Sequence, residues 1–355
     1  MIFSQENSEI IFTISTGNEL ARIISQAGKK FFLLTDSNTI NACYPEIKNS
    51  LGENIPIFTI NAGEENKNIQ TVVEVWDFLN KKGANRKSVL INLGGGVLCD
   101  LGGFAASTFK RGLDFINIPT TLLSQVDASV GGKTGINFKS YKNEIGTFSF
   151  PLKVIIDTGF LKTLTKEHLL SGYAEMIKHA FISDESYYHE LQKIDFKSND
   201  IDYSCLLELV KHSVKIKEKV VLTDPVESGL RKILNFGHTV GHAFESYFMG
   251  TPDEISHGRA VIYGMAVELY LSCKKAGFPE NKLLEALNYL NNTYGKLDFK
   301  KTDYEKLVNL MTHDKKNDSA NINFTLIKDF GKPMFDMFAK KEEIIEAFDY
   351  YMKSV

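Results

Sequence analysis

Five side chains between residues 175 and 257 are of the types that bind catalytic divalent metals. Glu175 and His179 lie in the segment GYAEMIKHA, and His257 lies in ISHGRA. His238 and His242 in NFGHTVGHAFE are four residues apart, which places them on one face of a helix. One carboxylate with two imidazoles is a common ligand set for catalytic zinc and leaves a coordination position open. The sequence therefore predicts a metal site, but spacing alone does not choose its ligands among these five residues.

A small set of basic residues is predicted to bind an anion. Lys133 follows two glycines in VDASVGGKTGIN, close to Asp127, which favours a formed anion pocket. Arg231 precedes Asn235 and His238 by about one and two helical turns, so we expect these three side chains to face one ligand. Basic side chains gathered at one place indicate a small substrate that carries carboxylate or phosphate. The basic residues singled out are Lys133, Lys142, Lys178, Lys217 and Arg231.

A glycine-rich turn in the first half of the chain is a candidate phosphate-binding loop. The strand-like run Val89–Leu93 leads into Gly94–Gly96, and a helix-compatible stretch begins near Val97. Glycines let the backbone approach a pyrophosphate closely, and a helix N-terminus directs amide groups at the anion. Asp36 ends an earlier strand-like run, where a carboxylate binds ribose hydroxyls and favours NAD over NADP. The alternative interpretation of the glycines alone is an ordinary tight turn.

Two regions of different character must position these residues. In the first, short apolar runs alternate with helical patterns such as Asn68–Lys81, which is typical of a doubly wound parallel sheet. After Asp157, strand-like runs become rare and long amphipathic helices dominate. The expected strands are Ile10–Ile14, Phe31–Thr35, Ile57–Ile60, Val89–Leu93, Phe115–Ile118 and Val154–Ile156. The expected helices of the second region are Cys205–Val221, His257–Ala276, Glu280–Leu290, Tyr304–Met311 and Glu342–Met352.

Length and composition predict a two-domain globular protein. A chain of 355 residues is longer than one ordinary single-core domain, and 43% hydrophobic residues provide material for two cores. We expect a Rossmann-like α/β domain with a parallel sheet over residues 1–158 and a mainly α-helical metal- and substrate-binding domain over residues 159–355. The formal net charge of −3 gives no indication of a nucleic-acid or membrane partner. Four dispersed cysteines, without a targeting or membrane-spanning segment, predict a cytoplasmic protein.

Six segments, taken in order, resemble the 3-dehydroquinate synthase family over nearly the whole chain. They are GGGVLCDLGGFAASTFKRG, IPTTLLSQVDASVGGKTGIN, YKNEIGTF, GYAEMIKHA, LRKILNFGHTVGHAFE and SHGRA. The resemblance implies an NAD-binding α/β domain followed by a helical domain that holds one divalent metal, zinc or cobalt. It also implies a homodimer in which Arg111 reaches the neighbouring subunit's site.

The resemblance further implies roles for individual residues. The metal ligands would be Glu175, His238 and His257, and His242 would contact substrate instead. The implied NAD contacts are Asp36, Asn38, Glu64, Lys67, Gly94, Gly95, Gly96, Val97, Asp100, Thr120, Thr121, and the segment from Phe160 to Thr163. The implied substrate contacts are Asp127, Lys133, Asn143, Lys178, Lys217, Arg231, Asn235 and His242. Lys142 lies between the two sets, Lys133 belongs to both, and one of Lys315 and Lys316 would close the pocket.

The activity that the resemblance implies belongs to the shikimate pathway of aromatic amino acid biosynthesis. It is the conversion of 3-deoxy-D-arabino-heptulosonate 7-phosphate to 3-dehydroquinate and phosphate. Bound NAD would oxidise one hydroxyl, phosphate would leave by elimination, the hydride would return, and the ring would open and reclose by an aldol step. The alternatives are another sugar-phosphate cyclase of the same superfamily, of the valiolone or deoxy-inosose type, a metal-dependent polyol dehydrogenase, and a non-catalytic NAD-binding sensor.

Overall fold

The chain divides into two compact units. The computed structural model describes residues 8–354 except residues 53, 140, 197–200 and 313–320. The first unit contains Met1–Leu169 and Asp200–Glu218, and the second contains Leu170–Asn199 and Lys219–Val355. The segment Asp200–Glu218 thus belongs to the first unit although it follows part of the second. A domain boundary between residues 158 and 159 stays a prediction.

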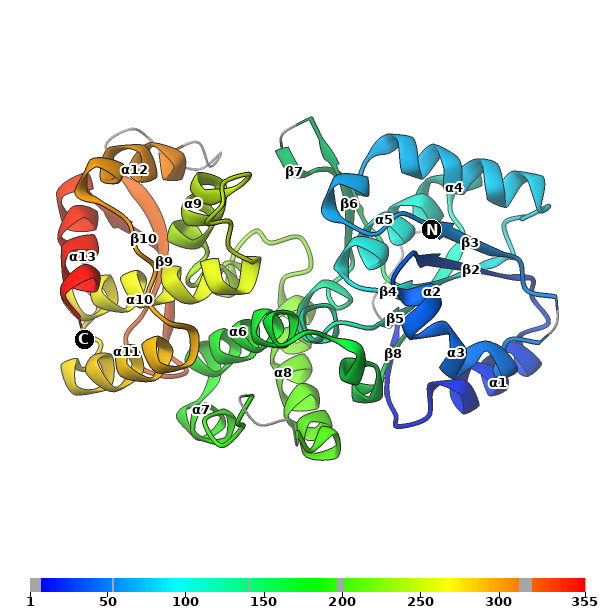
Figure 1. Ribbon diagram of the computed structural model, residues 1–355, viewed down its shortest axis with the longest axis horizontal. Helices are drawn as coiled ribbons and strands as arrows, with labels where there is room; N and C mark the ends of the chain where they lie inside the picture. The colour runs from blue at the N-terminus through cyan, green and yellow to red at the C-terminus, as the bar shows by residue number, and fades with distance from the viewer. Residues whose placement is uncertain (1–7, 53, 140, 197–200, 313–320, 355) are drawn as a thin grey trace. The chain divides into compact units, whose positions relative to one another are not determined.

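The first unit is built around a six-stranded parallel sheet (Figure 1). The strand order is β1-β8-β5-β4-β2-β3, and all neighbouring strands run parallel. The six predicted strands are confirmed, although β1 ends before Ile14, whose side chain is 79% exposed. The strands are β1 (Glu9–Phe12), β2 (Phe31–Asp36), β3 (Ile57–Ile60), β4 (Val89–Gly94), β5 (Asp114–Pro119) and β8 (Lys153–Ile156).

Helices cover both faces of this sheet because its central strands are apolar on both sides. In β2, Phe31 and Leu33 join one buried core, and Phe32 and Leu34 join the other, as alternating side chains of a strand must. The first core also contains residues of α1 and α3, and the second contains residues of α4 and α5 (Figure 1). The helices are α1 (Thr16–Ala27), α2 (Thr39–Ala42), α3 (Tyr44–Ile47), α4 (Ile69–Lys81) and α5 (Gly96–Thr108).

The helix predicted over Asn68–Lys81 is confirmed as α4, and its start has a clear cause. The side chain of Asn68 accepts a hydrogen bond from the backbone N–H of Thr71 at 3.0 Å, which satisfies one of the amides left open at a helix N-terminus. An antiparallel hairpin of β6 (Lys133–Phe138) and β7 (Tyr141–Phe148) was not predicted. Most of β7 is exposed, so its sequence lacks the apolar pattern of a buried strand.

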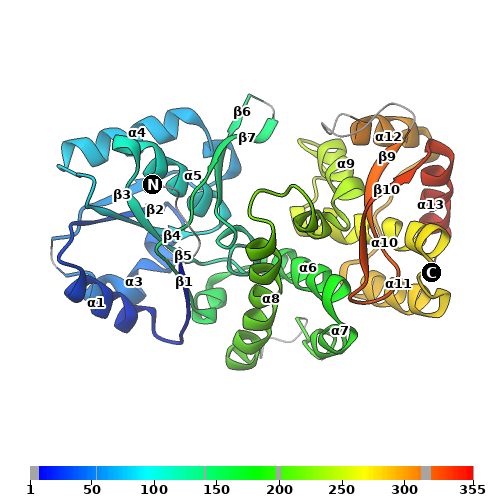
Figure 2. The same ribbon diagram turned by 180° about the vertical axis from the view of Figure 1, so that it is seen from behind.

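The second unit is mainly helical and also contains one antiparallel hairpin (Figure 2). The predicted helices are confirmed, with ends that differ by a few residues. The hairpin of β9 (Ile322–Ile327) and β10 (Pro333–Ala339) was not predicted, and β9 packs against α10. The helices are α6 (Lys166–Ser183), α7 (Glu185–Leu191), α9 (His238–Phe248), α10 (His257–Ala276), α11 (Glu280–Tyr294), α12 (Tyr304–Thr312) and α13 (Lys341–Lys353). Helix α8 (Tyr203–Thr223) belongs mostly to the first unit, which extends to Glu218. Within the described ranges, no helix combines the length and apolar character that crossing a membrane requires.

Candidate metal centre and cofactor site

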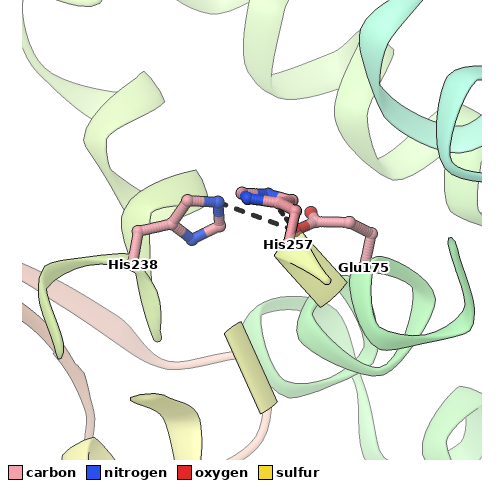
Figure 3. A group of neighbouring side chains, drawn as sticks. All are labelled: Glu175, His238 and His257. Carbon is pink, nitrogen blue, oxygen red and sulfur yellow. Dashed lines mark ion pairs between the residues drawn. The ribbon is translucent and has the colours of Figure 1, made fainter. Parts of the chain in front are cut away.

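Three side chains from three helices of the second unit converge on one point (Figure 3). Glu175 lies in α6, whereas His238 and His257 are the first residues of α9 and α10. The Nε2 atoms of His238 and His257 lie 3.6 and 3.7 Å from Oε1 of Glu175. The three ligand atoms of this group all lie within 4.8 Å of one another.

The spacing and burial of these groups fit a divalent cation. Ligand atoms around a tetrahedral zinc lie roughly 3.4 Å apart when the metal–ligand bonds are about 2.1 Å. The separations from Oε1 of Glu175 are close to that value. Glu175 is fully buried, and its carboxylate oxygens face Nζ of Lys178 and the Nε2 atoms of His238 and His257. A buried carboxylate requires positive charge nearby, and a metal ion would add to the charge that Lys178 provides.

Burial and neighbouring charges set the protonation states of the three groups. Two of them are ready to bind a metal ion, and the third must first lose a proton. Burial alone would raise the pKa of Glu175, but the Lys178 ammonium and the two imidazoles hold it well below its usual range. Burial and Lys178 hold the pKa of His238 well below normal, so its imidazole is neutral. Burial opposes protonation of His257, but hydrogen bonds to Glu175 and Glu245 raise its pKa to about 10. Metal binding at His257 therefore releases a proton.

Glycines let α9 and α10 approach closely enough to bring the two histidines together. A Cβ atom on Gly264 of α10 would lie 2.0 Å from the carbonyl oxygen of Gly237, at the start of α9. A Cβ atom on Gly241 would lie 2.9 Å from the carbonyl oxygen of Ala260. Both positions therefore exclude larger residues without movement of the helices.

A buried carboxylate fixes the first turn of α9. Glu268 in α10 accepts hydrogen bonds from the backbone N–H groups of Gly237 at 2.6 Å and Val240 at 3.1 Å. It thereby satisfies amides that a helix leaves open at its N-terminus. Burial raises the pKa of Glu268 to about 8. Because His238 lies between the two amides, Glu268 holds the backbone that carries this histidine.

Glu245 is a functional candidate that the sequence reasoning missed. Its Oε2 atom lies 3.2 Å from Nδ1 of His257, while the other ring nitrogen faces Glu175. A carboxylate on the second nitrogen fixes the ring orientation and tautomer of a metal-binding histidine. The sequence did contain a signal, because Glu245 follows His242 by three residues and shares its helix face.

The remaining predicted ligand candidates occupy different positions. His242 is exposed, and its ring centroid lies 5.2 Å from that of His238 and 5.9 Å from that of His257. With Glu245 and His257 it forms a second group whose ligand atoms lie within 4.8 Å. His179 is fully buried one turn beyond Glu175 in α6. The ligand set Glu175, His238 and His257 stays a prediction that this geometry favours.

A pocket of about 180 Å³ lies next to His238 within the second unit. Asn235 and His242, both expected to contact substrate, line it together with Glu227, which was missed. Oε1 of Glu227 accepts a hydrogen bond from Nδ2 of Asn235 at 2.9 Å. The other residues around this pocket are Lys232, Thr239, Asn323, Phe324, Thr325 and Asp336.

Arg231 does not follow the helical geometry expected for it. The turn η7 (Leu230–Asn235) is a 3₁₀ helix, and Gly237 with φ 81° separates it from α9. Arg231 is buried, and its Nη1 donates a hydrogen bond to the carbonyl of Pro225 at 2.7 Å. The structure therefore brings Asn235 and His238 to one pocket, whereas Arg231 is not one of the described residues that line it.

The glycine turn of the first unit has the geometry of an anion site. Strand β4 ends at Gly94, and α5 begins at Gly96 without a side-chain cap. A Cβ atom on Gly94 would lie 2.1 Å from the side chain of Leu98, and one on Gly95 would lie 3.1 Å from that of Thr121. Uncapped amides at the start of a 13-residue helix, after a turn built from glycine, fit a pyrophosphate.

Other residues expected to bind NAD lie at the same carboxyl edge of the sheet. Asp36 ends β2, and its Oδ1 accepts hydrogen bonds from the backbone N–H groups of Asn38 at 2.9 Å and Thr39 at 2.8 Å. Thr120 and Thr121 follow β5, where the Thr120 N–H donates to the carbonyl of Gly94 at 3.0 Å. Parallel strands deliver these residues to one edge, where such folds bind ligands.

Two buried lysines organise carboxylates in the first unit. Nζ of Lys67, which is 4% exposed, donates to Oδ2 of Asp100 at 2.6 Å and to Oδ1 of Asn143 at 2.5 Å. Burial raises the pKa of Asp100, although Lys67 opposes this shift. Nζ of Lys217 donates to both the backbone carbonyl and Oδ1 of Asp127 at 2.6 Å. Residues predicted to bind NAD and residues predicted to bind substrate therefore meet within this unit.

The other predicted residues are placed as follows. Lys133 and Lys142 are exposed on the β6–β7 hairpin. The side chain of Phe160 lies in the core of the first unit, and Thr163 donates to its carbonyl at 2.7 Å. Arg111 is exposed with a left-handed φ of 68°. Lys178 is 1% exposed and pairs with Oε2 of Glu175, whereas Lys315 and Lys316 lie outside the described residues.

Removal of His257 should abolish metal binding and leave the fold intact. His257→Ala deletes one ligand but retains the ion pair between Glu175 and Lys178. Glu175→Gln should also lose the metal, and should in addition lower the free energy of unfolding by about 3–5 kcal/mol, because it leaves a buried ammonium without its partner. Elemental analysis and thermal unfolding measure the two effects. His242→Ala is the control and should keep its metal, whereas unchanged metal content in His257→Ala would contradict the ligand assignment.

Replacement of Glu245 should weaken metal binding without removing a ligand. Glu245→Gln withdraws the carboxylate from Nδ1 of His257, and loss of such a partner typically lowers metal affinity about 10–100-fold. Competition with a chromophoric chelator measures the affinity. Glu254→Gln, which alters a carboxylate bound to the backbone of Gly250, is the control. Equal affinities for the Glu245→Gln variant and the unmodified protein would exclude this role.

Comparisons with known proteins show what the whole chain is similar to. The family model for the 3-dehydroquinate synthase N-terminal region matches residues 57–171, and that for the C-terminal region matches residues 172–317. A 3-dehydroquinate synthase from Parabacteroides distasonis is 48% identical over 326 residues, which cover 92% of each chain.

Two solved structures share the fold of the whole chain. One is a 2-deoxy-scyllo-inosose synthase complexed with carbaglucose-6-phosphate, NAD⁺ and Co²⁺, with a TM-score of 0.84, 24% identity and 96% of each chain covered. The other is a 2-epi-5-epi-valiolone synthase from Streptomyces hygroscopicus subsp. jinggangensis with NAD⁺ and Zn²⁺ bound. Its TM-score is 0.82 at 25% identity, with 98% of this chain and 97% of that chain covered. From the matches along its sequence, the chain belongs to the 3-dehydroquinate synthase family.

Proposed function

We propose that this protein converts 3-deoxy-D-arabino-heptulosonate 7-phosphate to 3-dehydroquinate and phosphate, as a 3-dehydroquinate synthase. The observation that carries the proposal is the convergence of Glu175, His238 and His257 beside a pocket lined by Asn235 and His242. In a chain that is 48% identical to a curated 3-dehydroquinate synthase, this group supports the activity of that relative.

One bound divalent metal and bound NAD complete the proposed enzyme. The metal would polarise an alcohol as a Lewis acid, and NAD would accept a hydride and return it. Glu175, His238 and His257 hold the metal, and Glu245 orients the third of these ligands. The glycine turn binds the pyrophosphate of NAD, and Asp36 binds its ribose and disfavours a 2′-phosphate. Zinc and cobalt are both compatible with this ligand set.

Basic and amide side chains bind and orient the anionic substrate in this proposal. Lys133 begins β6 as an exposed residue, and Lys217 is held by Asp127. Asn235 and His242 present polar groups to the pocket beside the metal ligands. Charged donors that are already fixed by neighbours lose little entropy when they bind phosphate or carboxylate. The substrate is therefore oriented for several successive steps, and its own phosphate can act as base during elimination.

The proposal extends to a homodimer in the cytoplasm. In it, Arg111 reaches the site of the neighbouring subunit. Arg111 and Lys110 both adopt left-handed backbone conformations, with φ of 68° and 50°. Such conformations are energetically costly for non-glycine residues, and residues that adopt them are frequent at functional sites. That strain supports a functional role for the turn that carries Arg111.

An activity assay tests the function directly. The protein with zinc, NAD and 3-deoxy-D-arabino-heptulosonate 7-phosphate should release one phosphate for each cyclic product formed. NADH should not accumulate, since the hydride returns to the product in each turnover. Glucose 6-phosphate should release no phosphate. Turnover of glucose 6-phosphate alone would indicate another sugar-phosphate cyclase, and steady accumulation of NADH would indicate a dehydrogenase.

Lys133→Ala should weaken substrate binding far more than NAD binding. A hydrogen bond to a charged group contributes about 1.5–3 kcal/mol, so the substrate KM should rise roughly 10–100-fold. NAD affinity, measured by equilibrium dialysis, should change little. Lys139→Ala on the same hairpin is the control, because its ammonium lies over the ring of Phe138. Equal losses in substrate and NAD affinity would contradict the role of Lys133.

A further inference from the structure

Asn137, a partly exposed residue of the β6–β7 hairpin, makes hydrogen bonds through its backbone and through both polar atoms of its side chain. It lies in β6, and its backbone N–H donates to the carbonyl of Lys67 at 2.8 Å. Its side-chain Nδ2 donates to Oε1 of Glu64 at 2.8 Å. Its Oδ1 accepts a hydrogen bond from the backbone N–H of Asn143 at 2.9 Å. Asn137 thus joins two segments that are far apart in the sequence, one containing Glu64 and Lys67 and the other containing Asn143.

The contact with Asn143 fixes a backbone conformation that is costly to maintain. Asn143 has a φ of 53°, in the left-handed region that non-glycine residues seldom adopt. Such a conformation persists where surrounding contacts hold it. Here Asn137 holds the backbone amide, and Nζ of Lys67 holds the side-chain oxygen at 2.5 Å. The direction of the Asn143 amide group therefore depends on both neighbours.

The contacts with Glu64 and Lys67 fix the loop that follows β3. This loop contains the short helix η3 (Glu64–Asn66) and Lys67, and we call it the 64–67 loop. Asn137 binds its first residue through a side chain and its last residue through the backbone. Lys67 in turn binds Asp100, at the start of α5, at 2.6 Å. The contacts form a closed network, so displacement of the 64–67 loop also displaces the partners of Asn143.

We propose that Asn137 is a positioning residue that couples NAD binding at the 64–67 loop to substrate binding at Asn143. The inference rests on the proposed function, in which Glu64, Lys67 and Asp100 contact NAD and Asn143 contacts substrate. Coupling between two binding sites is reciprocal. If bound NAD raises the affinity for substrate, bound substrate raises the affinity for NAD by the same factor. Loss of Asn137 should consequently weaken both ligands, although it touches neither.

Two substitutions separate the two arms of the contact. Asn137→Ala removes the donor to Glu64 and the acceptor for Asn143. Asn137→Asp keeps an acceptor for the Asn143 amide but loses the donor, and it places a second carboxylate next to Glu64. Asn85→Ala is a matched control in the same unit, because the Asn85 side chain also accepts a backbone N–H, that of Lys87 at 2.8 Å.

The experiment measures the dissociation constant of NAD by equilibrium dialysis, together with KM and kcat for the heptulosonate phosphate, on the zinc-loaded protein. In Asn137→Ala we expect both the dissociation constant of NAD and the KM of the substrate to rise about tenfold. This factor is within the usual range by which one site changes the affinity of another. In Asn137→Asp the NAD constant should rise as far, while KM measured at saturating NAD stays within about threefold of the unmodified protein, because bound NAD then holds the 64–67 loop and the acceptor for Asn143 is kept. Asn85→Ala should change neither, and thermal unfolding verifies that each variant is folded.

The outcomes separate this inference from the function on which it rests. If the unmodified protein binds no NAD or releases no phosphate, the proposed function fails. If it does both, and the NAD constant and KM of Asn137→Ala lie within twofold of those of the unmodified protein, the coupling role of Asn137 is overturned while the proposed function stands. A KM in Asn137→Asp as high as in Asn137→Ala would also overturn it, because the acceptor for Asn143 would then have no effect. Should Asn137→Ala not fold, Asn137→Asp decides, because an NAD constant within twofold of that of the unmodified protein would overturn the role of Asn137.

Discussion

The carboxylate of Glu175 is fully buried, and the helices of the second unit are arranged around its charge. Transfer of an ion from water into a protein interior costs several kcal/mol unless opposite charge compensates it. Lys178 from the same helix provides a positive charge, and His238 and His257 from two other helices place their Nε2 atoms 3.6 and 3.7 Å from Oε1 of the carboxylate. The positions of α6, α9 and α10 therefore follow from one requirement, that these groups reach a single carboxylate.

Close helix packing makes that convergence possible. Gly237 and Gly264 bring the start of α9 against the middle of α10, at a distance that no side chain would permit. Glu268 then binds the backbone amides on both sides of His238 and holds the first turn in place. In this way a second buried carboxylate sets the position of His238, a proposed metal ligand. Glu245 does the same for His257 by binding the ring itself.

The sequence predicted the elements whose residues repeat with a clear period. The strands of the parallel sheet are apolar on both faces, and the long helices carry an apolar stripe, so both were identified. The β6–β7 hairpin was missed because β7 is largely exposed, and its sequence therefore carries no burial pattern. The expectation that Arg231, Asn235 and His238 share a helix did not allow for the turn at Gly237. Glu227 and Glu268 act through contacts made by the folded chain, and their positions in the sequence gave no sign of this.

The ion pair between Lys178 and Glu175 joins residues three apart on one helix, so it forms as soon as α6 is in place. The protein thus contains its own counter-ion for the carboxylate that would later bind metal. We therefore expect a newly made chain to fold without the ion and to acquire it afterwards. Scarcity of the ion would then limit the number of active molecules and not the number of folded molecules.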